Sequence, residues 1–105
     1  MKKVLIVEDE ADISQLLSLR LDMLGFEVIR VADGALAVER VYKEIPDLIS
    51  LDLNLPRMSG EEICKAIRED FNEKISAIPI IMVTGKDLLV DKIVGKVIGA
   101  NAYLT

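Results

Sequence analysis

Short apolar runs alternate along this chain with longer segments in which apolar residues recur at helical spacing. Each run is bounded by glycine, proline or charged residues, which is typical of strands buried on both faces of a parallel sheet. The predicted strands are residues 3–7, 26–31, 48–51, 79–83 and 102–104. This alternation predicts an α/β fold with a doubly wound parallel sheet, strand order 2-1-3-4-5 and right-handed crossovers.

Four helices are predicted from apolar residues that share one helical face. They are residues 13–24, 35–43, 61–71 and 86–98. The expected buried stripes of the first three are Ile13, Leu16, Leu17, Leu21 and Leu24, then Leu36, Val38 and Val41, then Ile63, Cys64, Ile67 and Phe71. The last helix has more large apolar residues than one buried stripe needs, so we expect some of them to be exposed at an interface.

The composition fits one globular domain. The 105 residues are 51% hydrophobic and 30% charged, which suits a single core and argues against disorder. The net charge of −5 disfavours binding to nucleic acid. Cys64 is the only cysteine, so no intrachain disulfide is expected. No apolar run approaches the roughly 20 residues that span a bilayer, and we expect a cytoplasmic domain without membrane contact.

Polar side chains follow three of the predicted strands where each strand ends. Glu8 and Asp9 follow the first strand, Asp52 the third and Thr84 the fourth. The first and third strands are neighbours in the predicted order, so the three carboxylates should meet at the switch point of the sheet. Charges about 4 Å apart repel by roughly 4 kcal/mol at an effective dielectric constant near 20. Such a cluster either has raised pKa values or binds a hard divalent cation, for which magnesium is suited.

Asp52 is the candidate nucleophile. It ends a short apolar run, and Pro56 and Gly60 prevent the strand from continuing far beyond it. A carboxylate beside a metal can attack phosphorus, although a helix cap or a surface acid is the simpler interpretation of Asp52 alone. Thr84 either donates its hydroxyl to a phosphoryl oxygen or is a turn residue before Gly85.

Four stretches of the chain resemble the receiver domain of two-component response regulators. They are Val4-Leu5-Ile6-Val7-Glu8-Asp9, Asp52-Leu53-Asn54-Leu55-Pro56-Arg57-Met58-Ser59-Gly60, Met82-Val83-Thr84-Gly85 and Gly99-Ala100-Asn101-Ala102-Tyr103-Leu104-Thr105. The resemblance covers the whole chain and implies a flavodoxin-like fold. It also implies that Asp52 accepts a phosphoryl group from a histidine kinase or a phosphotransfer protein. Such a chain is a signalling phosphoacceptor and not an enzyme in the ordinary sense.

The same resemblance implies a magnesium ion bound by Asp9, Asp52 and the backbone carbonyl of Asn54. Glu8 stands where the family more often has aspartate, and its longer side chain is expected to reach the metal through water. Thr84 and Tyr103 are implied to be switch residues, with a plain edge-strand aromatic as the alternative for Tyr103.

The family pattern continues after Thr105 with a lysine and a fifth helix, and no residue of this chain supplies that catalytic lysine. We therefore expect residues 1–105 to be an incomplete receiver domain with a partly uncovered sheet. Association with a second copy is expected through that face or through the helix 86–98.

Other classes of protein fit parts of the pattern. A flavodoxin-type FMN binder would need a first loop rich in serine, threonine and glycine instead of acids. A phosphatase of the haloacid-dehalogenase type would need a second acid at the position of Asn54. A phosphorylation-independent pseudoreceiver that acts only as an interaction module, and a shortened chain with impaired switching, remain open.

Overall fold

The computed structural model describes residues 2–83 and 90–104, and only the backbone of residues 103 and 104. The elements in these ranges are β1 (Lys3–Val7), α1 (Ala11–Met23), β2 (Glu27–Val31), α2 (Gly34–Glu44), β3 (Leu48–Asp52), α3 (Gly60–Arg68), α4 (Glu73–Ser76), β4 (Ile80–Val83) and α5 (Val90–Leu104). The four strands form one parallel sheet in the order β2-β1-β3-β4. Within the described ranges, no helix has the length and apolar character needed to cross a membrane.

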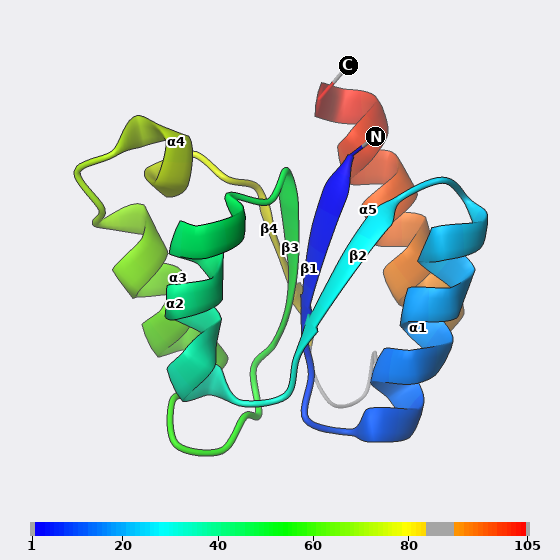
Figure 1. Cartoon of the computed structure of the whole chain (residues 1–105), viewed down its shortest axis with the longest axis horizontal. Coiled ribbons are helices and arrows are strands. Elements are labelled where there is room, and N and C mark those ends of the chain that lie inside the picture. Colours follow the sequence, from blue (N-terminus) through cyan, green and yellow to red (C-terminus); the bar gives the residue numbers. More distant parts are fainter. Residues whose placement is uncertain (1, 84–89, 105) are drawn as a thin grey trace.

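Helices cover both faces of the sheet (Figure 1). The helices α2, α3 and α4 lie on one face, and α1 and α5 lie on the other. Successive residues of β1 point to opposite faces, so Leu5 belongs to the core under α2 and α3 while Ile6 belongs to the core under α1 and α5. All five residues of β3 are buried. The first four strands and their parallel arrangement therefore confirm the prediction from the apolar runs.

The predicted fifth strand is wrong. Residues 102–104 form the last turn of α5 and not a strand, so in its described part the sheet has four strands and not the order 2-1-3-4-5. Gly99 does not end the helix: its backbone is helical, with no positive φ, and a side chain there would meet open space, so the position does not require glycine. Gly95 and Gly99 each cost the helix α5 about 1 kcal/mol. Burial of Ile93, Val94 and Val97 stabilises it by about 1.5–3 kcal/mol each, so the helix continues in spite of the glycines.

The expectation of a missing helix and an uncovered sheet face is not confirmed. Five helices are present in the described residues, and α5 packs beside α1 against β3 and β4. The proposed association through an uncovered face therefore loses its basis. Of the apolar residues expected to mark an interface on the helix 86–98, Ile93, Val94 and Val97 are buried and Ile98 is 47% exposed. Leu88 and Leu89 lie outside the described residues, so that interface stays a prediction.

The third predicted helix is too long. α3 ends at Arg68, whose guanidinium donates to the carbonyl oxygens of Ser76 and Ile78 and so draws the chain back toward the sheet. Phe71 lies in the loop after α3 and is fully exposed, contrary to the prediction that it belongs to the buried stripe. The extra helix α4 buries Ile75 instead.

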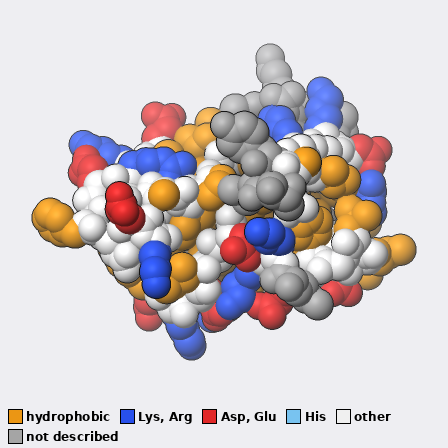
Figure 2. All heavy atoms as spheres, turned by 90° about the horizontal axis from the view of Figure 1, so that it is seen from above, with side chains coloured by type: hydrophobic (Ala, Val, Ile, Leu, Met, Phe, Trp, Pro, Cys, Tyr) orange, Lys and Arg blue, Asp and Glu red, His pale blue; other side chains and the backbone are white. Residues whose placement is uncertain are grey.

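The predicted stripes of α1 and α2 are also too wide. Leu16, Leu24 and Leu36 are about half exposed. Small residues are among the buried positions of these helices, namely Ser14 in α1 and Ala37 in α2. At the end of the molecule where α5 terminates, acidic and basic side chains are interspersed (Figure 2), without a large patch of one charge.

Candidate metal centre

Asp52 is the last residue of β3, and the structure buries it at the carboxyl end of the sheet. Its side chain is 4% exposed, and Oδ1 accepts a hydrogen bond of 3.0 Å from the backbone N–H of Asn54. This local turn fixes the carboxylate relative to the strand. In the described part of the chain, Asn54 supplies the only backbone N–H that donates to the side chain of Asp52.

Two glycines allow the loop after Asp52 to fold tightly against the sheet. A side-chain carbon on Gly60 would lie 2.5 Å from the carbonyl oxygen of Asp52, and one on Gly34 would overlap the carbonyl oxygen of Met58. Real carbon atoms do not approach backbone so closely, so these positions require glycine in this geometry. Arg57, in the same loop, adopts a left-handed backbone conformation with φ of 68° and pairs with the carboxylate of Asp33.

Glu8 follows β1 and is also buried, at 4% exposure. Its Oε2 accepts a hydrogen bond of 3.0 Å from the N–H of Glu10, and its own N–H donates to the carbonyl of Val31 in β2. Burial raises the pKa of Glu8 from 4.5 to about 7; the Glu10 N–H opposes this rise and the negative charge of Asp52 adds to it. Without a cation, Glu8 is therefore protonated more readily than an ordinary glutamate.

The structure brings Glu8, Asp9 and Asp52 together as predicted. One carboxylate oxygen of each lies within 4.8 Å of the others, and Asp9 is exposed while the other two are buried. None of the three forms an ion pair with a cation in the described ranges. Hard oxygen ligands in a compact group, with one pKa raised by crowding and burial, fit a divalent cation such as magnesium.

The remaining predicted site residues have different outcomes. Asn54 lies next to the cluster and contributes its N–H to Asp52, while its carbonyl as a metal ligand stays a prediction. Thr84 lies outside the described residues. The backbone of Tyr103 is helical and not extended, so the edge-strand interpretation of this residue is wrong, and its switch role stays a prediction.

Sequence reasoning missed the contacts that support the cluster. The pair between Arg57 and Asp33 joins the loop after Asp52 to the start of α2. Ser14 and Arg30, which are hydrogen-bonded at 2.9 Å, help to line a cavity of about 210 Å³ beside Glu8. The only signal in the sequence was the presence of opposite charges in separate loops, and pairing between loops depends on the tertiary fold.

Comparisons with known proteins agree with this geometry. Residues 4–105 match the family model described as the response regulator receiver domain. The chain is 42% identical to the alkaline phosphatase synthesis transcriptional regulatory protein PhoP of Bacillus subtilis, over 99% of this chain and 42% of that protein. The chain thus spans about two fifths of the length of the curated relatives it matches.

Solved structures give the same result. The chemotaxis response regulator CheY4 of Vibrio cholerae has a TM-score of 0.80 and 30% identity, covering 92% of this chain and 96% of that chain. The response regulator TrrA of Thermotoga maritima, solved in complex with Mg²⁺-BeF, has a TM-score of 0.70 and 32% identity. That match covers 80% of this chain and 70% of TrrA.

Proposed function

This chain belongs to the response regulator receiver family, and on that premise we propose that Asp52 accepts a phosphoryl group from the phosphohistidine of a histidine kinase or phosphotransfer protein. The observation that carries the proposal is the burial of Asp52 within 4.8 Å of two further carboxylates at the switch point of the sheet. In the reaction, a carboxylate oxygen of Asp52 forms a bond to phosphorus while the bond from phosphorus to the histidine nitrogen breaks. The released imidazole nitrogen keeps the electron pair, and the acyl phosphate remains on Asp52.

The hydrogen bond from Asn54 leaves Oδ2 as the attacking oxygen, because Oδ1 is already engaged. The negative cluster would repel a phosphoryl group by itself. We propose that Glu8, Asp9, Asp52 and the carbonyl of Asn54 hold a magnesium ion, which when bound offsets charge on the carboxylates and on the phosphoryl oxygens. TrrA, which was solved with Mg²⁺-BeF, supports this choice of metal.

The switch and the cellular context follow from the family. We assign Thr84 and Tyr103 the role of reporting phosphorylation to the partner surface, on the resemblance of their sequence context. We place residues 1–105 in the cytoplasm as a receiver domain that signals through a histidine kinase and needs neither nucleic acid nor membrane for this step.

Intact mass after incubation with magnesium and acetyl phosphate tests the proposal. We expect the chain to gain the mass of one phosphoryl group, and expect neither Asp52→Asn nor the chain with excess chelator to gain it. Asp47→Asn is a matched control, because Asp47 is an exposed acid at the opposite end of β3, and it should be phosphorylated like the parent. A mass gain in Asp52→Asn would show that another residue is the phosphoacceptor. No mass gain in the parent would favour a pseudoreceiver.

A further inference from the structure

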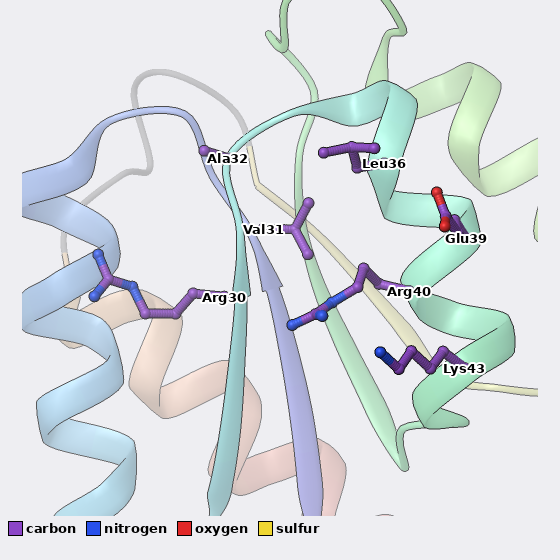
Figure 3. Close-up of a pocket in the computed structure, with 7 residues that line it drawn as sticks. All are labelled: Arg30, Val31, Ala32, Leu36, Glu39, Arg40 and Lys43. Atoms are coloured by element: carbon purple, nitrogen blue, oxygen red, sulfur yellow. The ribbon is translucent and has the colours of Figure 1, made fainter.

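A second concave surface lies at the edge of the sheet. A cavity of about 300 Å³ separates β2 from α2 (Figure 3), and we refer to it as the edge groove. Val31 and Leu36 contribute apolar surface, and Leu36 is 52% exposed although it is large. Figure 3 shows Arg40 and Lys43 extending from α2 toward the sheet, whereas the side chain of Arg30 turns toward α1.

Two of the three cations that line the edge groove, Arg40 and Lys43, have no partner in the chain as described. Arg40 and Lys43 take part in none of its ion pairs or side-chain hydrogen bonds, although Lys3, Arg20 and Arg57 each pair with a carboxylate. Glu39 also lines the groove but forms no ion pair with either cation. Two neighbouring unpaired cations over an apolar surface form a local site for an anionic group in a chain whose net charge is −5.

The backbone of β2 adds a second recognition element. Among the described strands β2 pairs only with β1, so its other side is an edge. The N–H of Glu27 donates to Lys2 and the carbonyl of Val31 accepts from Glu8. Alternate residues of a parallel strand bond to the same neighbour, so the N–H and carbonyl of Val28 and Arg30 face outward. Outward-facing groups of this kind pair readily with an added strand.

We propose that the edge groove binds an acidic segment of a partner protein in extended conformation. The segment pairs with the outer edge of β2, and alternate side chains on the α2 side enter the groove. Carboxylates contact Arg40 and Lys43, and an apolar side chain between them covers Leu36. The negative charge of the whole chain opposes binding of an acidic peptide, so the affinity depends on these two local cations. This surface is independent of Asp52 and of the proposed phosphoryl transfer.

A hexapeptide of sequence Glu-Thr-Val-Thr-Glu-Thr, acetylated and amidated at its ends, is a suitable probe, because its first, third and fifth side chains lie on one face of an extended strand. Titration into isotope-labelled chain should shift the amide resonances of Val28 and Arg30. The double variant Arg40→Gln/Lys43→Gln should bind at least about tenfold more weakly, because two charge-assisted contacts are lost. The matched control Lys74→Gln/Lys96→Gln loses the same charge from exposed positions elsewhere and should bind within about twofold of the parent.

Three further experiments distinguish the proposed acidic segment from other occupants of the edge groove. A peptide N-methylated at alternate residues lacks the edge-pairing donors, and equal binding by it would overturn strand addition. Succinate shifting Arg40 and Lys43 with the same affinity as the peptide would reduce the groove to a simple anion site and overturn the proposal. Concentration-dependent shifts at Val28 and Arg30 without peptide would assign the edge to a second copy of the chain and overturn it as well.

Discussion

The acidic cluster between β1 and β3 and the edge groove between β2 and α2 are opposites in charge and in burial. The cluster crowds three carboxylates, two of them buried, and burial raises the pKa of Glu8 to about 7. The groove holds two unpaired cations at a partly open surface, where water screens them. Because an unpaired charge is costly only when it is desolvated, the cluster should control stability and metal binding, while the groove should affect recognition alone.

The largest expected effect is on the free energy of unfolding, and it arises at Gly60, where the backbone packs closely beside the acidic cluster. Gly60→Ala places a carbon 2.5 Å from the carbonyl oxygen of Asp52, so the end of β3 and the start of α3 must separate. We expect a loss of about 3 kcal/mol in the free energy of unfolding, measured by urea denaturation. Gly95→Ala is the control, since an alanine there meets open space within α5 and should stabilise by about 0.5–1 kcal/mol. Equal effects of the two variants would show that the close approach at Gly60 is unimportant.

The next effect concerns pH. The pKa of Glu8 is higher in the folded chain, about 7, than its ordinary value of 4.5, so the folded state binds more protons between these values. In chelator, the stability contributed by Glu8 is present below pH 4.5 and is lost as the pH rises toward 7. At pH 8, Glu8→Gln should be more stable than the parent by about 1–3 kcal/mol. Urea denaturation across this range is the measurement, and an unchanged pH slope in Glu8→Gln would assign the titration to another group.

Metal affinity should respond to the cluster and not to the groove. Asp9→Asn removes one charged oxygen ligand, and we expect its magnesium affinity to fall by at least about tenfold, or about 1.4 kcal/mol. Calorimetric or NMR titration of the parent and the variant measures this. Lys43→Gln changes the net charge without touching the cluster and should leave the affinity within about twofold. Affinity that follows net charge alone would contradict a specific site.

The smallest effect is expected at the loop after Asp52. Arg57 pairs with Asp33, but its side chain is 74% exposed, so Arg57→Gln should cost less than about 1 kcal/mol of stability. Lys65→Gln removes a similarly exposed cation from its pair with Glu69 and is the control. If Arg57 also orders the loop, the amide resonance of Asn54 will shift in Arg57→Gln and not in Lys65→Gln. An unchanged Asn54 resonance in Arg57→Gln would show that this ion pair does not order the loop.

The sequence alone located the acidic cluster. Apolar runs predicted the first four strands, and each acid follows a strand directly. Because parallel strands end at the same edge, Glu8, Asp9 and Asp52 had to converge once β1 and β3 were neighbours. Pro56 and Gly60 likewise marked the end of β3, since the constraints of proline and glycine act locally.

Only the tertiary structure decided the rest. Residues 102–104 form a run too short to distinguish strand from helix by its period, and burial of the preceding turns of α5 against the sheet made the run helical. The buried stripes of α1 and α2 depended on how closely each helix approaches the sheet. Arg40 and Lys43 are ordinary helix-surface residues in sequence, and they form a groove only because α2 lies beside the open edge of β2. Local sequence patterns determine the individual strands and where each one ends, whereas contacts between distant segments depend on the packed fold.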